Sequence, residues 1–310
     1  MLIFTDSIDF ANKYFPEITE WKPLDLTKID QNILHLIQNL ISFKDIYFFD
    51  YHSNTDWHSL ILVEKAENSQ YDVLLESLNN NINLPDKILC FAGSGENFHG
   101  FHSRKWLALE GNIHLTVYLK PNVEIKNNYL SFLLLSVISV IETLDSINTL
   151  NEKAYIKWIN DIYIDSTKVS GVLAQTHIQG SKITDAVLGV GLNVETTPTQ
   201  VTDEFIPNAA SLNDFLQNEN QLKNNDVLFK LIENIECNYK KILNGDSNKL
   251  IEEYLSKCNI IGRQAVVYSD EFSQNLKIIA KGKIKNIGEN LELYIENFPE
   301  PITNGRLVLK

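Results

Sequence analysis

The sequence predicts an α+β fold, in which helices flank a mixed, largely antiparallel sheet and a small β domain follows at the C-terminal end. Strand-like and helical segments are interleaved between residues 60 and 150. Three strand-like segments joined by tight turns come next, which is typical of an antiparallel meander. The last fifty residues hold short apolar segments separated by Gly, Asn and Asp, as in a small SH3-like barrel.

The elements follow in order from this pattern. Apolar residues at helical spacing, or long apolar runs, predict helices at residues 30–43, 68–80, 129–146 and 224–258. Alternating or continuously apolar segments of strand length predict strands at residues 60–66, 87–93, 111–121, 154–165, 167–180 and 183–195. The chain is therefore expected to contain an N-terminal extension of unknown role (1–56), a central domain (57–258) and a C-terminal SH3-like β domain (259–310).

Composition limits the function classes. The net charge of −13 and the pI near 5.0 argue against a nucleic-acid partner. The longest apolar run, residues 129–144, is short and contains serines, so no membrane partner is expected. The N-terminal residues lack the basic start of a signal peptide, and three scattered cysteines suggest reduced thiols. A cytoplasmic location is therefore expected.

One short segment concentrates polar residues in an otherwise apolar setting. "KWINDIYIDSTKVSG", residues 157–171, contains Lys157, an Asn160–Asp161 pair, Lys168 and Gly171. In a continuous strand, residues 157, 159 and 161 would share one face. A lysine beside a cleft between two strands can neutralise a carboxylate or a phosphate. A surface hairpin with solvated lysines would show the same spacing.

Three linked blocks in this region resemble the signature of the biotin–protein ligase family, whose fold is shared by lipoate ligases and octanoyltransferases. The family pattern Lys-Trp-Pro-Asn-Asp is matched at 157–161 with Ile159 in place of proline. Its Lys-hydrophobic-small-Gly block is matched at 168–171, and its Gly-hydrophobic-Gly-hydrophobic-Asn block at 189–193. Together the blocks are far more specific than a single glycine motif. The resemblance covers roughly residues 57–310, and the first 55 residues do not look like a winged-helix DNA-binding domain.

The resemblance implies an activity and a set of roles. In the family, ATP activates the carboxylate of the ligand as an acyl-adenylate, which a lysine of a carrier domain then attacks. By resemblance, Lys168 contacts the carboxylate and then the acyl-phosphate, and Lys157 helps to hold the nucleotide or the acceptor lysine. The resemblance further implies that Asn160 and Asp161 bind the triphosphate with Mg²⁺ and that Gly171 and Asn193 line the pocket. It also implies that Asn68 and Ser69 donate or accept hydrogen bonds at the polar end of the ligand.

The glycine-rich loop departs from the family pattern Gly-Arg-Gly-Arg-x-Gly-Arg-x-Trp. Here it reads "GSGENFHGFHSRKW", residues 93–106. Counting forward from Ser69 makes Gly93 and Gly95 the first glycines, with about four extra residues before Trp106. Counting back from Trp106 makes Gly100 the second glycine and puts Phe101 in the place of an arginine. On either count Arg104 and Lys105 remain, and a small rise in pKa would protonate the nearby His99 and His102. Trp106 is either core or a wall of the ligand pocket.

Three hypotheses follow. The first is an ATP-dependent biotin–protein ligase that uses Mg²⁺ and modifies the biotin carboxyl carrier domain of a carboxylase. The second, suggested by the altered loop, is a lipoate or octanoate ligase or transferase on the same fold. The third is a weakened relative that binds the ligand without turnover. The sequence leaves open which acid and which carrier are used, and whether the chain forms a homodimer.

Overall fold

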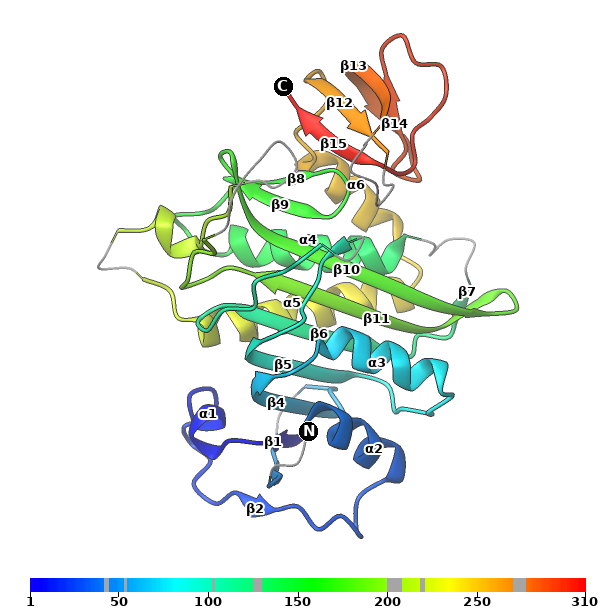
Figure 1. Cartoon of the computed structure of the whole chain (residues 1–310). Helices are drawn as coiled ribbons and strands as arrows, with labels where there is room; N and C mark the ends of the chain where they lie inside the picture. The colour runs from blue at the N-terminus through cyan, green and yellow to red at the C-terminus, as the bar shows by residue number, and fades with distance from the viewer. Residues whose placement is uncertain are drawn as a thin grey trace.

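The computed structural model describes residues 1–41, 45–52, 55–101, 104–124, 130–199, 208–217, 221–269 and 277–310. Within these ranges the chain forms a large mixed sheet of 11 strands and a second sheet of four strands. Helices cover both faces of the large sheet (Figure 1). The predicted fold class is confirmed.

Ten strands follow one another across the large sheet. β4 pairs in parallel with both β1 and β5. Every other neighbouring pair in the order is antiparallel. β7 (Val123–Glu124) pairs with the far end of β11. The ten strands, in sheet order, are β2 (Lys22–Pro23), β3 (Tyr47–Asp50), β1 (Leu2–Thr5), β4 (Ser59–Ala66), β5 (Ile88–Gly95), β6 (Ile113–Leu119), β11 (Lys182–Leu192), β10 (Thr167–Gln179), β9 (Asp161–Ile164) and β8 (Ala154–Lys157).

The central strands are buried on both faces, so their side chains alternate between two apolar layers. In β5, Leu89 and Phe91 enter one layer, whereas Ile88, Cys90 and Ala92 enter the other. The first layer is completed by α4 (Ser131–Asp145), α5 (Asn224–Leu243) and α6 (Asn248–Lys257), and the second by α2 (Gln31–Leu40) and α3 (Gln70–Asn79). Burial on both faces explains why these strands appear in the sequence as short, nearly continuous apolar runs.

The long apolar run predicted as a core helix is α4, and most of its residues are buried. Two of its buried hydroxyl groups are satisfied inside the helix, since Ser136 Oγ donates to Phe132 O at 3.0 Å and Thr143 Oγ1 donates to Ser139 O at 2.6 Å. Over the described part of the chain, no helix combines the length and apolarity that crossing a membrane would require.

The N-terminal residues join the large sheet. β1 pairs in parallel with β4, from Leu2 opposite Ser59 to Thr5 opposite Leu62. Behind it, α1 (Ile8–Asn12) places the Phe10 ring parallel to that of Phe91, with centroids 6.0 Å apart. The sheet therefore continues across residue 56.

Two predicted elements are wrong in their continuity. Residues 154–165 form two strands, β8 and β9, joined by a turn at residues 158–160. Lys157 and Asp161 do share one face, but as opposed partners across the hairpin. The turn is anchored from outside, because Tyr254 Oη donates to Ile159 O at 3.0 Å. The predicted helix 224–258 is likewise two helices, separated at Gly245, whose φ is +81°.

The C-terminal residues form the second sheet, which lies at the β8–β9 end of the large sheet and far from the N-terminal strands (Figure 1). Its four strands are antiparallel in the order β14-β13-β12-β15. A hydrogen bond of 2.6 Å from Trp158 Nε1 to Leu291 O joins the 158–160 turn to this part of the chain. The strands are β12 (Gln264–Tyr268), β13 (Ile278–Ile287), β14 (Leu293–Ile295) and β15 (Arg306–Leu309).

Candidate active site

A cleft with two adjoining compartments lies at the ends of β9, β10 and β11, under the loop of residues 96–106. The inner compartment, a cavity of about 100 Å³, extends over β6, β10 and β11. The outer compartment, about 470 Å³, reaches from the 158–160 turn to residues 303–308 of the C-terminal sheet. Their shared border consists of Phe101, Arg104, Lys105, Trp106, Asn160, Asp161 and Lys168.

The border is marked by an ion pair between neighbouring strands. Lys168 Nζ lies 2.6 Å from Asp161 Oδ1, and each side chain is only about one-fifth exposed, at 21% and 20%. Lys168 is the second residue of β10, and Gly171 of the same strand lies opposite Asp161 of β9. A Cβ at Gly171 would come within 3.0 Å of Lys168 Nζ. The glycine predicted to admit a ligand therefore makes room for the lysine itself.

Two further glycines seat aromatic side chains that line the inner compartment. A Cβ at Gly191 would lie 2.4 Å from Trp106 Cζ2, and one at Gly189 would lie 3.1 Å from Tyr71 Cδ2. Trp106 is thus a wall of the pocket, and Lys168 Nζ lies 5.7 Å from its ring centroid. The Gly-Val-Gly block matters here because it lets aromatic rings lie flat on the strand.

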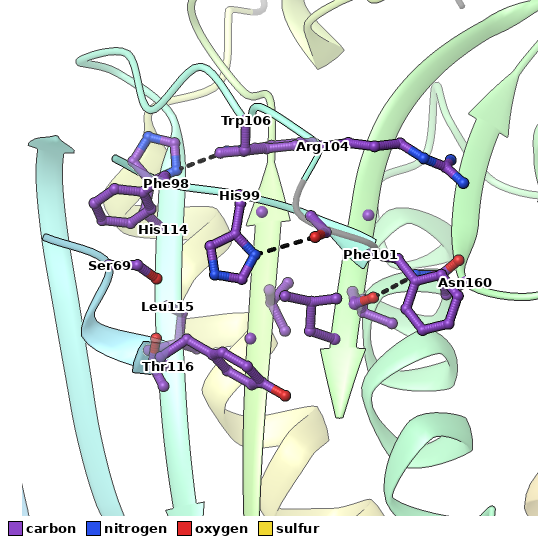
Figure 2. Close-up of a pocket in the computed structure, with 18 of the residues that line it drawn as sticks. Ser69, Phe98, His99, Phe101, Arg104, Trp106, His114, Leu115, Thr116 and Asn160 are labelled. Atoms are coloured by element: carbon purple, nitrogen blue, oxygen red, sulfur yellow. Dashed lines mark hydrogen bonds between the residues drawn. The ribbon is translucent and has the colours of Figure 1, made fainter. Parts of the chain in front are cut away.

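A buried histidine fixes the orientation of Trp106. Trp106 Nε1 donates to His114 Nδ1 at 3.3 Å (Figure 2). The other ring nitrogen of His114 lies 3.0 Å from Leu109 O. Burial lowers the pKa of His114 to about 4, and the hydrogen bond to Leu109 O opposes this only in part. The ring is therefore neutral near pH 7, with its proton on Nε2, which is the tautomer that both hydrogen bonds require.

Residues 96–101 and 104–106 form the two sides of a narrow hairpin over the inner compartment. Gly100 N donates to Arg104 O at 2.7 Å, and Trp106 N donates to Phe98 O at 2.9 Å. Figure 2 shows His99 pointing into the pocket, with Phe101 and Arg104 further toward its outer side. Phe101 is 44% exposed. His102 lies outside the described residues.

The glycines of the loop lie in two different settings. Gly100 lines the inner compartment, as counting back from Trp106 predicts. Gly93 and Gly95 line neither compartment: a Cβ at Gly93 would meet Phe10 at 2.5 Å, and one at Gly95 would meet Phe98 at 2.3 Å. Both glycines instead allow close packing around the base of the loop.

The predicted polar residues divide in the same way. Ser69 is buried and lines the inner compartment, but Asn68 lies outside both, with its Oδ1 3.4 Å from Asn97 Nδ2. Asn160 lines both, and its Nδ2 donates to Val172 O at 2.6 Å. Asn193 lines the outer compartment, but its buried amide donates to Ala210 O at 3.2 Å, which indicates a structural role.

The outer compartment is strongly cationic. Burial lowers the pKa of Lys157, the Asp161 carboxylate opposes this, and the charges of Lys168, Arg104 and Arg263 lower it further. Lys157 Nζ lies 3.4 Å from Tyr163 Oη. Among the residues that the structure describes, no three His, Cys, Asp or Glu side chains are grouped to hold a metal. An arrangement of clustered cations and one carboxylate suits a polyanion.

Comparisons with known proteins agree with this geometry. Residues 66–193 match the sequence model of the biotin/lipoate A/B protein ligase family. The match covers 128 of the 310 residues, about two-fifths of the chain. The family segment contains the loop, the Lys168–Asp161 pair and the Gly-Val-Gly block, whereas the outer wall at residues 303–308 lies beyond it.

Individual relatives differ in how much of their length the match covers, and this chain spans about two-fifths of the curated relative named first. The bifunctional ligase/repressor BirA of Bacillus subtilis is 28% identical over 133 residues, which span 43% of this chain and 40% of that protein. The biotin protein ligase from Aquifex aeolicus, solved in complex with biotin and ATP, is 23% identical with a TM-score of 0.60, covering 82% of this chain and 99% of that one. The Leishmania major biotin protein ligase, solved in complex with biotinyl-5-AMP, is 16% identical with a TM-score of 0.50, covering 81% and 98%. The two structures show a shared fold.

The sequence missed residues that reach the site from other elements. Tyr71 from α3 and His114 from β6 line the inner compartment, and residues 303–308 line the outer one. Tyr71 directly follows the Asn68–Ser69–Gln70 segment, so its place at the start of the predicted helix was the one signal that could have indicated it. His114 and residues 303–308 have no sequence spacing that connects them to the 157–171 segment.

Proposed function

We propose that this chain is an ATP-dependent biotin–protein ligase, which forms biotinyl-5′-adenylate and transfers biotin to a lysine of a carboxylase carrier domain. The observation that carries the proposal is the Lys168–Asp161 pair at the border of two compartments. The inner compartment, apolar along Val172 and Val190, suits the acid, and the cationic outer one suits the nucleotide. The family segment and the biotin-bound and ATP-bound structures of fold relatives support this assignment.

The first half of the reaction requires two anions to meet. A carboxylate oxygen of biotin attacks the α-phosphorus of ATP, an acyl–O–P bond forms, and pyrophosphate leaves with the electrons of the broken P–O bond. Lys168, Arg104 and Lys105 lie at the border, where they can neutralise both anions. Such cations are most effective when they are already positioned before the reaction. Asp161 holds Lys168 in that position.

The second half transfers the acyl group. The neutral amine of a carrier lysine attacks the acyl carbon, the amide C–N bond forms, and AMP leaves as the C–O bond to the phosphate breaks. The amine proton passes to solvent. The acceptor lysine would reach the border through the outer compartment, which residues 303–308 also line.

Magnesium fits this site as a companion of ATP. Mg²⁺ prefers oxygen ligands and is often held by one or two carboxylates together with substrate phosphates. Asp161 is the carboxylate at the border, and Asn160 adds an amide oxygen beside it. When bound, the ion would offset charge on the phosphates.

The proposal is tested by replacing Lys168. We expect Lys168→Ala to lower biotin-dependent pyrophosphate release by about 100-fold or more, since an uncompensated anion pair costs several kcal/mol. The melting temperature should change little, because the side chain is not part of the core. The matched control is Lys153→Ala, an exposed lysine outside the cleft, which should retain full activity. Full activity in Lys168→Ala would refute the assignment of the site.

A further inference from the structure

Three lysines form a row on one strand of the C-terminal sheet. Lys281, Lys283 and Lys285 of β13 are all exposed, whereas Ala280 and Ile284 of the same strand are buried. Residues two apart in a strand point to the same face, so Lys281 and Lys283 share the outward face. Lys285 follows at an irregularity in the pairing with β14. This lysine row extends over about 13 Å, at about 3.3 Å per residue.

The lysine row differs from other exposed lysines in its lack of acidic partners. Over the described ranges, neither an ion pair nor a side-chain hydrogen bond involves any of its three side chains. By contrast, Lys65 Nζ lies 2.8 Å from Glu96 Oε1, and Lys240 Nζ lies 2.6 Å from Glu236 Oε1. In the part of the chain that the structure describes, the charge of the row is therefore not neutralised by a contact.

The rest of the chain carries the opposite charge. Residues 259–310 have seven Lys and Arg against six Asp and Glu, a net charge of +1. Residues 1–258 have 20 against 34, a net charge of −14. The field of the chain as a whole therefore repels an acidic protein, and the row attracts it locally. Such an arrangement fixes where and in which orientation an acidic partner approaches.

The lysine row lies on the face of the C-terminal sheet that leads to the outer compartment. Lys281 is opposite Val266 of β12, which is opposite Val308 of β15. Opposed residues of antiparallel strands share a face, and strands lie about 4.8 Å apart, so Lys281 lies about 10 Å from Val308. Val308 lines the outer compartment. Val266 is buried, so the exposed row borders the covered part of this face.

We propose that the lysine row docks an acidic carrier domain and orients it so that the acceptor lysine of that domain enters the outer compartment. The inference rests on the proposed function, in that the partner is taken to be the protein that receives the acyl group. None of the three lysines lines either compartment, so the row acts on docking and not on the chemistry.

A nucleic acid would also be attracted by lysines, but the size of the row favours a protein. A set of about 6–10 phosphate contacts on DNA needs more cations than three lysines supply. The net charge of −14 on residues 1–258 would also repel a long polyanion. A folded carrier domain needs only a small group of carboxylates that faces the row.

The experiment measures biotin transfer to a recombinant biotin carboxyl carrier domain of net negative charge. One variant combines Lys281→Gln, Lys283→Gln and Lys285→Gln, and a second changes the same three lysines to Arg. The control changes three exposed lysines outside the C-terminal sheet to Gln and so removes the same charge; these are Lys22, Lys28 and Lys153. Thermal melts check that each variant is folded.

We expect the Gln variant to lower kcat/KM for the carrier domain about tenfold at low ionic strength, mainly through KM, as for three exposed charge pairs. The difference should disappear at about 1 M salt, where the screening length is about 3 Å. The Arg variant and the control should match the wild type. Pyrophosphate release, and transfer of biotin to hydroxylamine, should be unchanged in every variant because neither needs the carrier domain.

Wild-type transfer by the Gln variant, or an equal loss in the control, would overturn the proposal. Binding of a carrier domain whose acceptor lysine is replaced by arginine, followed by surface plasmon resonance, does not depend on activity. If biotin gives no pyrophosphate release, the proposed function fails and this binding still decides. Weaker binding by the Gln variant than by the control would support the row, and equal or absent binding would overturn it. Loss of affinity for a fluorescent DNA duplex, with carrier binding unchanged, would also overturn it.

Discussion

Replacing Gly191 with alanine tests how the inner compartment is built. The added Cβ would lie 2.4 Å from Trp106 Cζ2 and 2.5 Å from Trp106 Cε2, whereas carbon atoms pack at about 3.5–4.0 Å. Something must therefore move by about 1 Å. Gly191 is held between His114 and Gly171 on the neighbouring strands, so the indole moves and the strand does not. Overpacking of this kind costs about 1–3 kcal/mol.

If the displaced indole reduces the free energy of biotin binding by this amount, biotin binding weakens by about 5- to 150-fold, because 1.4 kcal/mol corresponds to a factor of ten. Calorimetry measures the loss, and a thermal melt checks that the variant is folded. Gly189→Ala is the graded control, because its Cβ meets Tyr71 at the milder distance of 3.1 Å. The decisive comparison adds Gly191→Ala to Trp106→Leu, which lacks the ring. An equal loss of affinity with and without the indole would show that the added methyl group does not act through Trp106.

Three other changes test different parts of the structure. Lys157→Met should weaken ATP binding about tenfold by removing a phosphate-facing charge. Because the lowered Lys157 pKa makes the unfolded state bind more protons, wild-type stability should rise with pH up to about 10.5, and thermal melts of the variant should lack that rise. Trp158→Phe removes the hydrogen bond to Leu291 O and should cost about 1–2 kcal/mol in urea unfolding; no change would mean that the 158–160 turn does not depend on the C-terminal residues. Phe10→Ala should cost about 3–5 kcal/mol by the same method, and a loss below about 1 kcal/mol would mean that α1 is peripheral to the core.

The fold was predictable where burial alone shapes the sequence. β4, β5 and β6 are buried on both faces, so each appears as an apolar run of strand length between turn residues. α4 is likewise an apolar run too long for a strand. The mixed sheet with flanking helices follows from these elements.

Elements held by distant partners were not predictable. β1 has four residues, and its pairing with β4 joins segments more than fifty residues apart. The 158–160 turn was not predicted because Trp158 and Ile159 are residue types typical of strands. Trp158 and the Ile159 carbonyl are tied to Leu291 and Tyr254, which no local pattern reveals.

The site shows the same division. Lys168, Asp161 and Gly171 are close in sequence and meet through one tight hairpin, so their spacing predicted a common location. The glycine loop could not be placed by counting, because its register is set by the hairpin contacts of His99 and Trp106. Gly93 and Gly95 therefore seemed equivalent to Gly100 in sequence but lie elsewhere.

The most direct test of the account is ATP-dependent pyrophosphate release by the wild-type protein with biotin, lipoate or octanoate in separate reactions. We expect release with biotin, because Lys168 and the cationic outer compartment would hold the biotin carboxylate against ATP. Tight biotin binding without pyrophosphate release would contradict it. The cleft would then bind an acid without activating it.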